Sequence, residues 1–208
     1  MILPVEVFGV IEENAYFFID DETQHGFLID PGAQADELLK IIDERGFIIE
    51  KILLTHGHFD HIGAVNEIQR ALKVPVCMGK DGNHYAKDAA INCSAFVGEP
   101  IILENVIYLE DYAEISLSAN PDFKVKLIPA PGHTTDGAIY YSEKKSIAFV
   151  GDTIFRGSYG RTDLPGGDYV ELMKTIREKV LTLPEKTILY TGHGQETTVA
   201  AEKEIWNV

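Results

Sequence analysis

Short apolar runs recur along the chain, and most of them have the length and the borders of β-strands. They are rich in β-branched and aromatic residues, and glycine, proline or acidic turn residues bound them. In the first part of the chain the predicted strands are LPVEVFGV (3–10), AYFFID (15–20), GFLIDPG (26–32), IIEKILLT (48–55) and VPVCMG (74–79). In the second part they are FKVKLIPAPGH (123–133), AIYYS (138–142), SIAFVGDT (146–153) and TILYTGHG (187–194).

A second pattern, in which apolar residues repeat every three or four positions, predicts helices between these strands. The segments are ADELLKIIDERG (35–46), GAVNEIQRAL (63–72), DYVELMKTIREKVLTL (168–183) and a last helix from about residue 198 to the end. Residues 80–110 have no clear period, and we expect a helix and a lid-like loop there. Two groups of strands, each with its own helices, predict an α/β fold with more than one sheet.

The composition narrows the class of protein. The 208 residues fit one domain, residues 1–208, and no apolar run approaches the roughly 20 residues of a membrane span. The N-terminus has no basic leader, so we expect no signal peptide. The net charge of −15, without a lysine- or arginine-rich run, argues against nucleic acid as a partner. Cys77 and Cys93 lack the spacing of a disulfide framework, and reduced cysteines fit a cytoplasmic protein.

Ligand-type side chains follow four of the predicted strands. These side chains are His56, His58, Asp60 and His61 in the segment THGHFDH, and His133, Asp152 and His193 at three later strand ends. In layered α/β folds, functional residues gather where strand ends meet one edge of the sheets. We therefore expect five of the seven histidines and two aspartates to converge in space. Asp30, at the end of GFLID, is a further candidate for this edge.

Each isolated residue also has a simpler explanation. A single histidine after a strand is more often a hydrogen-bonded structural residue than a ligand, and an aspartate there often caps a turn or a helix. The cluster within residues 56–61 is different, because four such side chains suit neither a core nor an ordinary surface. Seven potential ligands exceed the four of one tetrahedral zinc and suit two metal ions that share a carboxylate. Imidazole and carboxylate fit zinc, and they also fit iron or manganese.

These motifs resemble the metallo-β-lactamase superfamily. THGHFDH resembles its H-x-H-x-D-H signature, and IDPG (29–32), PGHT (131–134), GDT (151–153) and GHG (192–194) follow in the order of that family. The resemblance covers nearly the whole chain and implies a four-layer αββα sandwich with the site at one edge. It implies these roles: His56, His58 and His133 for a first metal, Asp60, His61 and His193 for a second, Asp152 as the bridge, and Asp30 as a residue that orients a ligand without binding metal.

Within the superfamily, the chain is most similar to glyoxalase II, a hydrolase of hydroxyacyl-glutathione thioesters. FRGSYGRTDLPGGD (155–168) resembles short bacterial members of that group. β-Lactamases of this fold usually lack a histidine at the position of His61, and many have cysteine in place of Asp152, so we do not expect antibiotic cleavage. Full-length glyoxalase II has a further helical domain that helps to grip glutathione, whereas this chain has space for one helix after His193. Recognition of glutathione therefore stays open.

The expected chemistry is hydrolysis of a small-molecule thioester by a hydroxide that bridges two metal ions. Asp60 would orient this hydroxide or carry a proton, in addition to binding metal. Arg156, Tyr159 and Arg161 are candidates for substrate contact because they follow the bridging aspartate. An ion pair between Arg161 and Asp163 and packing of Tyr159 are the simpler explanations for these residues.

Several alternatives stay open. A persulfide dioxygenase has the same fold and uses one iron, for which His56, His133 and Asp152 would be the ligands. A lactonase is a second alternative, because the ester carbonyl of a lactone and a thioester carbonyl make similar demands on a metal-bound hydroxide. Ribonuclease Z-like RNA processing fits the charge of −15 poorly, and a non-catalytic metal-binding scaffold does not explain an intact set of seven ligands. The acyl group, the thiol, the identity of the metal and the oligomeric state do not follow from the sequence.

Overall fold

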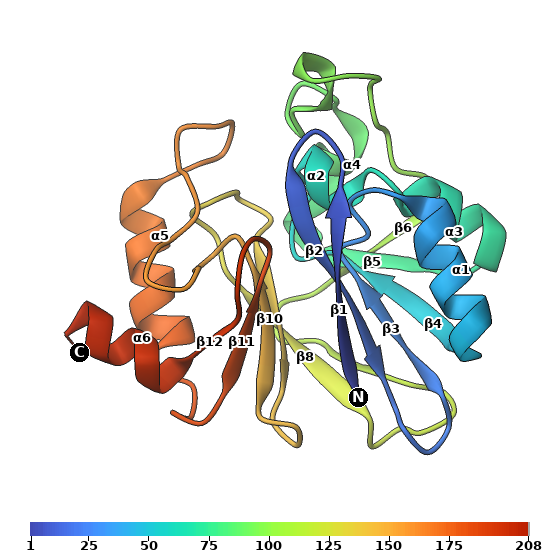
Figure 1. Ribbon diagram of the computed structural model, residues 1–208. Coiled ribbons are helices and arrows are strands. Elements are labelled where there is room, and N and C mark those ends of the chain that lie inside the picture. The colour runs from blue at the N-terminus through green and yellow to red at the C-terminus, as the bar shows by residue number, and fades with distance from the viewer. Residues whose placement is uncertain (208) are drawn as a thin grey trace.

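Two six-stranded β-sheets pack face to face in the computed structural model, which describes residues 1–207, and helices cover the outer faces (Figure 1). The prediction of an α/β fold with more than one sheet is confirmed. The four-layer αββα sandwich that the family resemblance implies is confirmed with it. Among residues 1–207, we find no helix with the length and apolar character that a membrane crossing requires.

The first sheet has the strand order β1-β2-β3-β4-β5-β6. Its strands are β1 (Ile2–Phe8), β2 (Glu12–Ile19), β3 (His25–Ile29), β4 (Ile48–Leu53), β5 (Val76–Gly79) and β6 (Val106–Leu109). The first three strands pair antiparallel, and β3 to β6 pair in parallel. Because parallel neighbours need a crossover connection, helices α1 (Ala35–Arg45) and α3 (Val65–Leu72) join them across one face.

The second sheet has the order β12-β11-β10-β9-β8-β7. Its strands are β7 (Glu114–Ser116), β8 (Lys124–Pro129), β9 (Ala138–Ser142), β10 (Ile147–Gly151), β11 (Ile188–Thr191) and β12 (Thr197–Thr198). Only β10 and β11 are parallel among the described strands of this sheet, and helix α5 (Tyr169–Thr175) lies in the connection between them. Helix α6 (Val199–Trp206) follows β12 and covers the same face.

Three hydrophobic cores hold the four layers together, and strand β2 contributes to two of them. Phe17 lies in the outer core beneath α1 and α3, while its neighbours Tyr16 and Phe18 lie in the core between the sheets. There the rings of Phe18 and Phe123 meet across the sandwich with their centroids 4.3 Å apart. The third core packs α5 and α6 against the second sheet. This alternation is what a strand buried on both faces requires.

The predicted helices are present, and one of them changes character. Helix α5 begins after Asp168, whose side chain accepts hydrogen bonds from two backbone N–H groups of the first turn. The single helix predicted over 168–183 instead becomes a π-helix at Ile176–Val180 and ends there. The short strands β6, β7 and β12 were not predicted, because two to four residues are too few to show a period.

Residues 80–110 form short helical pieces and a loop, as expected, and they end in strand β6, which was not expected there. The pieces are the 3-10 helix η1 (Lys80–Gly82), helix α4 (Asn83–Lys87) and the 3-10 helix η2 (Ser94–Phe96). Asn92 joins them, since its side-chain amide donates to the carbonyls of Tyr85 and Ile101, each at 2.9 Å. The segment lies at the upper end of the molecule in Figure 1, together with the β1–β2 turn and the loop before α5.

Candidate metal centre

The turn after β4 carries four of the predicted ligands. His58 is the N-cap of helix α2 (Phe59–Ile62), so Asp60 and His61 lie in the first turn of that helix. Gly57 allows the chain to pass close to α4, because a Cβ atom there would lie 2.4 Å from the Cβ of Tyr85. The three histidines of the turn are buried. The local backbone therefore places the histidines of the motif inside the protein, while Asp60 stays partly exposed.

The first group of candidate ligands consists of His56, His58 and His133. One ring nitrogen of each lies within 4.8 Å of the others. His58 Nδ1 is 2.9 Å from His133 Nε2, although 75 residues separate them in the chain. The loop after β8 brings His133 to this position, as the strand-end pattern predicted.

The second group consists of Asp60, His61 and His193, again with ligand atoms within 4.8 Å of one another. Asp152 lies between the two groups. Its Oδ2 is 3.5 Å from His133 Nε2 and 3.4 Å from His193 Nε2, and its Oδ1 is 3.4 Å from His61 Nε2. All seven predicted residues thus converge in one centre. Their division between two metal ions stays a prediction.

Buried polar atoms without a hydrogen-bond partner indicate what this centre can hold. Among the described residues they include His56 Nε2, His61 Nε2 and Asp152 Oδ1. Native proteins leave few buried acceptors unpaired, because each one has lost its hydration. Imidazole nitrogen and carboxylate oxygen are ligands for zinc and iron. The donor set therefore fits the metal ions that the fold implies.

His56 and His58 of the first group favour the neutral form. Burial and the neighbouring imidazoles hold the pKa of His56 well below its usual range. Burial, together with His133, lowers the pKa of His58 to about 3. Because neutral imidazole is the form that binds metal, protons offer little competition at these two positions.

The second group has the opposite electrostatics. Burial alone would lower the pKa of His61, but Asp152, Asp30 and Asp60 outweigh it, and the pKa lies well above its usual range. Burial also opposes the charge of His193, yet hydrogen bonds to the same two carboxylates, Asp152 and Asp60, raise its pKa to about 10. The charged histidines in turn lower the pKa of Asp60 and Asp152 against the effect of burial.

A second set of contacts fixes the outer nitrogens of the histidines. Asp30 Oδ2 is 3.1 Å from His61 Nδ1, and Asp30 Oδ1 accepts a hydrogen bond from Thr55 N at 2.7 Å. Asp30 thus lies where its predicted orienting role requires it. A partner of this kind sets the ring orientation and tautomer of a ligand histidine.

Two main-chain carbonyls orient further histidines and were not predicted. Arg161 O is 2.7 Å from His133 Nδ1, and Glu12 O is 2.5 Å from His193 Nδ1. Every residue has a carbonyl, so no sequence signal marks these two. Glu13 was also missed; it is buried, with an oxygen 3.7 Å from His61 Nδ1. Its signal is an acidic residue two positions before the apolar run AYFFI (15–19) of β2.

The structure ties the predicted substrate residues to the protein itself. Arg156 donates to Gln195 Oε1 at 2.7 Å. Arg161 donates to both carboxylate oxygens of Asp163, at 2.7 and 2.8 Å. The ring of Tyr159 lies near those of Tyr169 and Trp206, each with centroids 5.9 Å apart. The simpler explanations for Arg161 and Tyr159 thus describe contacts that exist, and contact with substrate stays a prediction.

Helix α6 holds the loop that contains these residues. The carboxylate of Glu202 is buried and accepts hydrogen bonds from Gly157 N at 3.1 Å, Thr197 Oγ1 at 2.7 Å and Trp206 Nε1 at 3.2 Å. The same loop supplies the Arg161 carbonyl that contacts His133. The C-terminal helix is thereby linked to the first ligand group.

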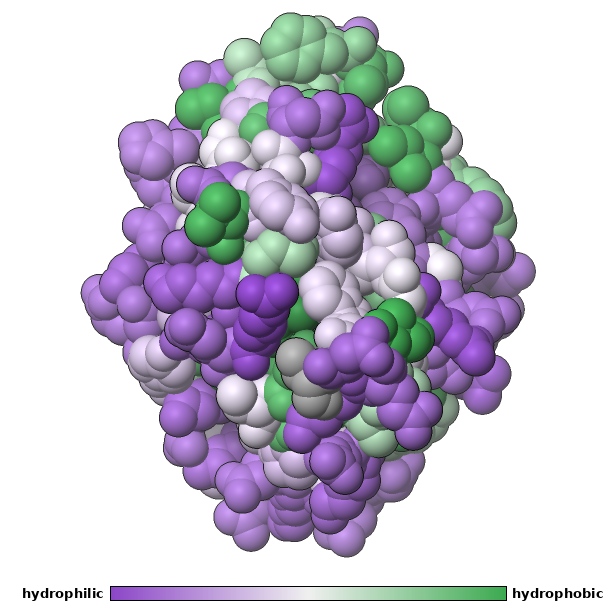
Figure 2. Space-filling model, turned by 90° about the vertical axis from the view of Figure 1, so that its left-hand side faces the viewer, coloured by the Kyte–Doolittle hydropathy of each residue, from purple (hydrophilic) through white to green (hydrophobic). Residues whose placement is uncertain are grey.

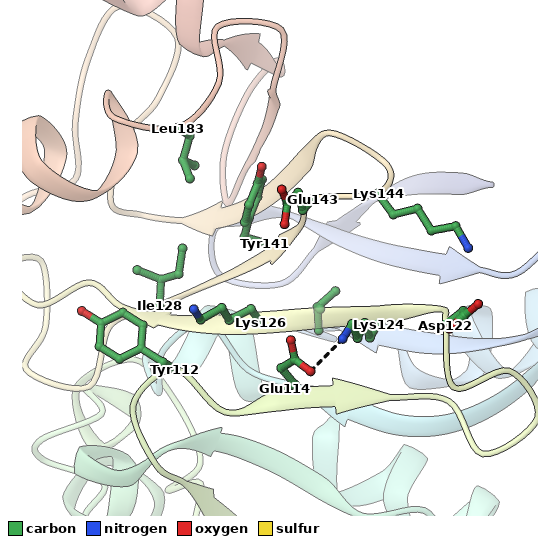
Figure 3. Close-up of a pocket in the computed structure, with 11 residues that line it drawn as sticks. Tyr112, Glu114, Asp122, Lys124, Lys126, Ile128, Tyr141, Glu143, Lys144 and Leu183 are labelled. Atoms are coloured by element: carbon green, nitrogen blue, oxygen red, sulfur yellow. Dashed lines mark hydrogen bonds and ion pairs between the residues drawn. The ribbon is translucent and has the colours of Figure 1, made fainter.

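A groove of about 710 Å³ opens elsewhere, on the outer face of β7, β8 and β9 (Figure 3). None of the clustered histidines and aspartates lines it. Its charged side chains balance in number, with three lysines (Lys124, Lys126 and Lys144) and three carboxylates (Glu114, Asp122 and Glu143). The candidate metal ligands are therefore gathered at the His/Asp centre and not in this groove.

Comparison with known proteins defines the class. The family model of the metallo-β-lactamase superfamily matches residues 9–193. The chain therefore belongs to the metallo-β-lactamase superfamily, and it is a metallo-hydrolase of that fold. Probable metallo-hydrolase YqgX of Bacillus subtilis is 36% identical over 94% of this chain and 92% of its own length. Hydroxyacylglutathione hydrolase GloC of Haemophilus influenzae is 32% identical over 97% and 93%.

Two solved structures are similar over almost the full length. BLEG-1, described as a B3 metallo-β-lactamase, superposes with a TM-score of 0.91 at 34% identity over 98% of this chain and 97% of its own. TTHA1623, described in a di-iron-bound form, has a TM-score of 0.86 at 34% identity over 98% of both chains.

Proposed function

We propose that the protein hydrolyses thioesters of the hydroxyacyl-glutathione class with two divalent metal ions. The observation that carries this proposal is the pair of adjacent ligand groups with Asp152 between them. Similarity to GloC, whose name gives it the hydroxyacylglutathione substrate, supports the choice of a thioester.

The residues of each group define where the ions would be held. His56, His58 and His133 would hold one, Asp60, His61 and His193 the other, and Asp152 would contact both. Zinc or iron fits the nitrogen and oxygen ligands, and manganese is the third candidate. Two such ions supply Lewis acidity for a carbonyl oxygen and make water a nucleophile at neutral pH.

The second group faces the incoming substrate. The side chain of His193 is 25% exposed and that of Asp60 is 9% exposed, whereas that of His61 is fully buried. A thioester carbonyl therefore reaches the centre from the side of His193, whose side chain is the more exposed. Because its pKa lies below the usual range, Asp60 is ionised at neutral pH and can accept a proton from the attacking water.

The loop of residues 155–168 is the polar wall of this proposed site. Arg156 and Arg161 are exposed and their guanidinium groups each have a partner at 2.7 Å. We assign them, with Tyr159, to the recognition of the thiol part of the substrate. In that role, Arg161 would exchange the carboxylate of Asp163 for a carboxylate of the thiol.

β-Lactam hydrolysis is the second candidate, because BLEG-1 is 34% identical with a TM-score of 0.91. The two functions differ in the bond that breaks, a C–S bond of a thioester or a C–N bond of a lactam. Both need a polarised carbonyl and an activated water, so the geometry of the ligand groups alone does not separate them.

The test combines metal content with a panel of substrates. Protein purified without added metal is analysed for metal and assayed with S-lactoylglutathione, a β-lactam, a lactone and glutathione persulfide. We expect two metal ions per chain and hydrolysis of the thioester. In His58→Ala, kcat/KM should fall more than the roughly 10–100-fold that loss of a supporting partner causes.

His84→Ala is the matched control, because His84 is exposed on α4, and it should keep both metal and activity. Thioester hydrolysis that survives loss of the metal would refute the proposal. One iron per chain with oxygen uptake on the persulfide would indicate a dioxygenase. If the protein cleaves the lactam or the lactone in preference to the thioester, that compound is the substrate class and the thioester is not.

A further inference from the structure

Large apolar side chains are exposed at the end of the sandwich that holds the metal centre. At the end of β1 and in the turn to β2, Phe8, Val10 and Ile11 are 57%, 65% and 47% exposed. At η2, Phe96 and Val97 are 73% and 39% exposed. We name these five residues the apolar rim. In Figure 2, hydrophobic side chains gather in the same way toward the upper end of the molecule, and the lower part is mostly hydrophilic.

Both parts of the apolar rim are attached to the open side of the centre. The β1–β2 turn ends at Glu12, whose carbonyl contacts His193 Nδ1 at 2.5 Å. On the other part, the carbonyl of Asn92 accepts a hydrogen bond from Phe59 N at 3.0 Å, directly before Asp60. Glu12 and Asn92, which lie close to the two parts of the rim in the chain, therefore anchor them to His193 and to the residue before Asp60.

Exposure of these side chains has no explanation in the packing of the fold. Val7 is 1% exposed and belongs to the outer core, while the adjacent Phe8 points outward from the same strand. An apolar patch at the surface is unfavourable in water, and such patches mark binding sites. A patch beside the proposed catalytic centre lies where it can bind the part of the substrate next to the reacting carbonyl.

The charge around the rim indicates which part of the substrate it binds. Residues 8–14 and 92–98 contain no lysine or arginine, and their charged residues are Glu12 and Glu13. Such a surface cannot pair with the carboxylates of a peptide thiol. The arginines of the centre, Arg156 and Arg161, lie on the separate loop of residues 155–168.

Resting on the proposed thioester hydrolysis, we propose that the apolar rim binds the acyl group of the substrate and gives the enzyme a preference for extended aliphatic acyl chains. The acyl chain packs against Ile11 and Phe96, and the polar thiol lies toward the arginine loop. The substrate class is therefore a thioester of a medium-length apolar acid with a small anionic thiol.

The experiment measures kcat/KM for glutathione thioesters with acetyl, butyryl, hexanoyl and octanoyl groups. A methylene that is fully buried is worth about fourfold, and one that is half covered about twofold. Across the six methylenes between acetyl and octanoyl, we expect a rise on the order of 50-fold. Ile11→Ser and Phe96→Ser should each lower the ratio of octanoyl to acetyl activity about threefold or more.

Ile48→Ser is the matched control, since Ile48 is 50% exposed but lies at the opposite end of β4 from the centre. This variant should leave the ratio unchanged. A flat series in the native protein, with acetylglutathione still cleaved, would overturn the rim proposal and leave the proposed function intact. If no thioester is cleaved by protein that contains its metal, the proposed function itself fails.

A second copy of the chain is the competing occupant. Sedimentation of the native protein and the two rim variants tests it directly. A dimer that the rim substitutions dissociate, with an unchanged octanoyl-to-acetyl ratio, would assign the rim to self-association and overturn the proposal. An unchanged sedimentation coefficient with a lowered ratio supports it.

Discussion

The two groups of candidate ligands lie side by side, yet they hold their histidines in opposite states. In the first, His56 and His58 have pKa values pushed down by burial and by other imidazoles. In the second, carboxylates raise the pKa of His61 and His193 against the effect of burial. The same type of side chain therefore serves as a neutral ligand on one side and as half of an ion pair on the other.

This difference means that protons and metal compete mainly at the second group. A metal ion must displace the protons of His61 and His193, whereas it finds His56 and His58 already neutral. The carboxylates that raise those pKa values also attract a divalent cation, so affinity and pH sensitivity increase together. The two positions should consequently be unequal even though the number of ligands is similar.

Acidification should separate the two groups most strongly, because it removes one ion completely while the other stays. The pKa of His193 is raised to about 10 and that of His58 is lowered to about 3. As pH falls from 8 to 5, protons therefore re-occupy the second group first, and the metal content should decrease from two ions to one. Metal analysis after equilibration with a weak chelator at each pH measures this. Simultaneous release of both ions would show that the groups do not differ in this way.

Substitution Asp30→Asn should weaken the second group selectively. Asp30 contacts His61 Nδ1 at 3.1 Å, and an amide retains the shape of the side chain but loses the charge that orients the imidazole. Loss of such a partner costs roughly 10–100-fold in metal affinity. Titration with a chromogenic chelator should show one weakened site and one unchanged site. Asp163→Asn is the control for a lost aspartate charge, because Asp163 is exposed and contacts no ligand. Equal weakening of both sites would contradict the assignment of Asp30.

The convergence of the seven candidate ligands could be predicted from the sequence, because each is a distinctive side chain at the end of an apolar strand. His133, Asp152 and His193 are far apart in the chain, but they share this position, and the fold brings their strand ends together. The carbonyls of Glu12 and Arg161 gave no such signal, because any residue could supply them. The pieces within residues 80–110 were also unreadable, since Asn92 joins them through specific hydrogen bonds and not through a repeating apolar face.

The smallest expected effect on activity is that of a substitution at Glu202 in helix α6, which acts on the first group. Glu202 accepts hydrogen bonds from Gly157 N, Thr197 Oγ1 and Trp206 Nε1, and the loop that it anchors supplies the Arg161 carbonyl for His133. In Glu202→Gln, one acceptor oxygen becomes an NH₂ group that opposes a buried donor, at a cost of about 1–3 kcal/mol of folding free energy.

We expect kcat/KM of Glu202→Gln to fall only a few-fold, since His133 keeps its own position on the β8 loop and loses part of its orientation. Affinity for the first metal should decrease with it, while the second site, which Asp30 supports, should keep its affinity. Glu204→Gln is the control, because Glu204 is exposed on the same helix. A loss of stability with both metal affinities unchanged would mean that α6 supports the fold alone. A loss of metal affinity confined to the first site would show that the first group depends on the loop held by α6. The second group depends instead on the carboxylate of Asp30.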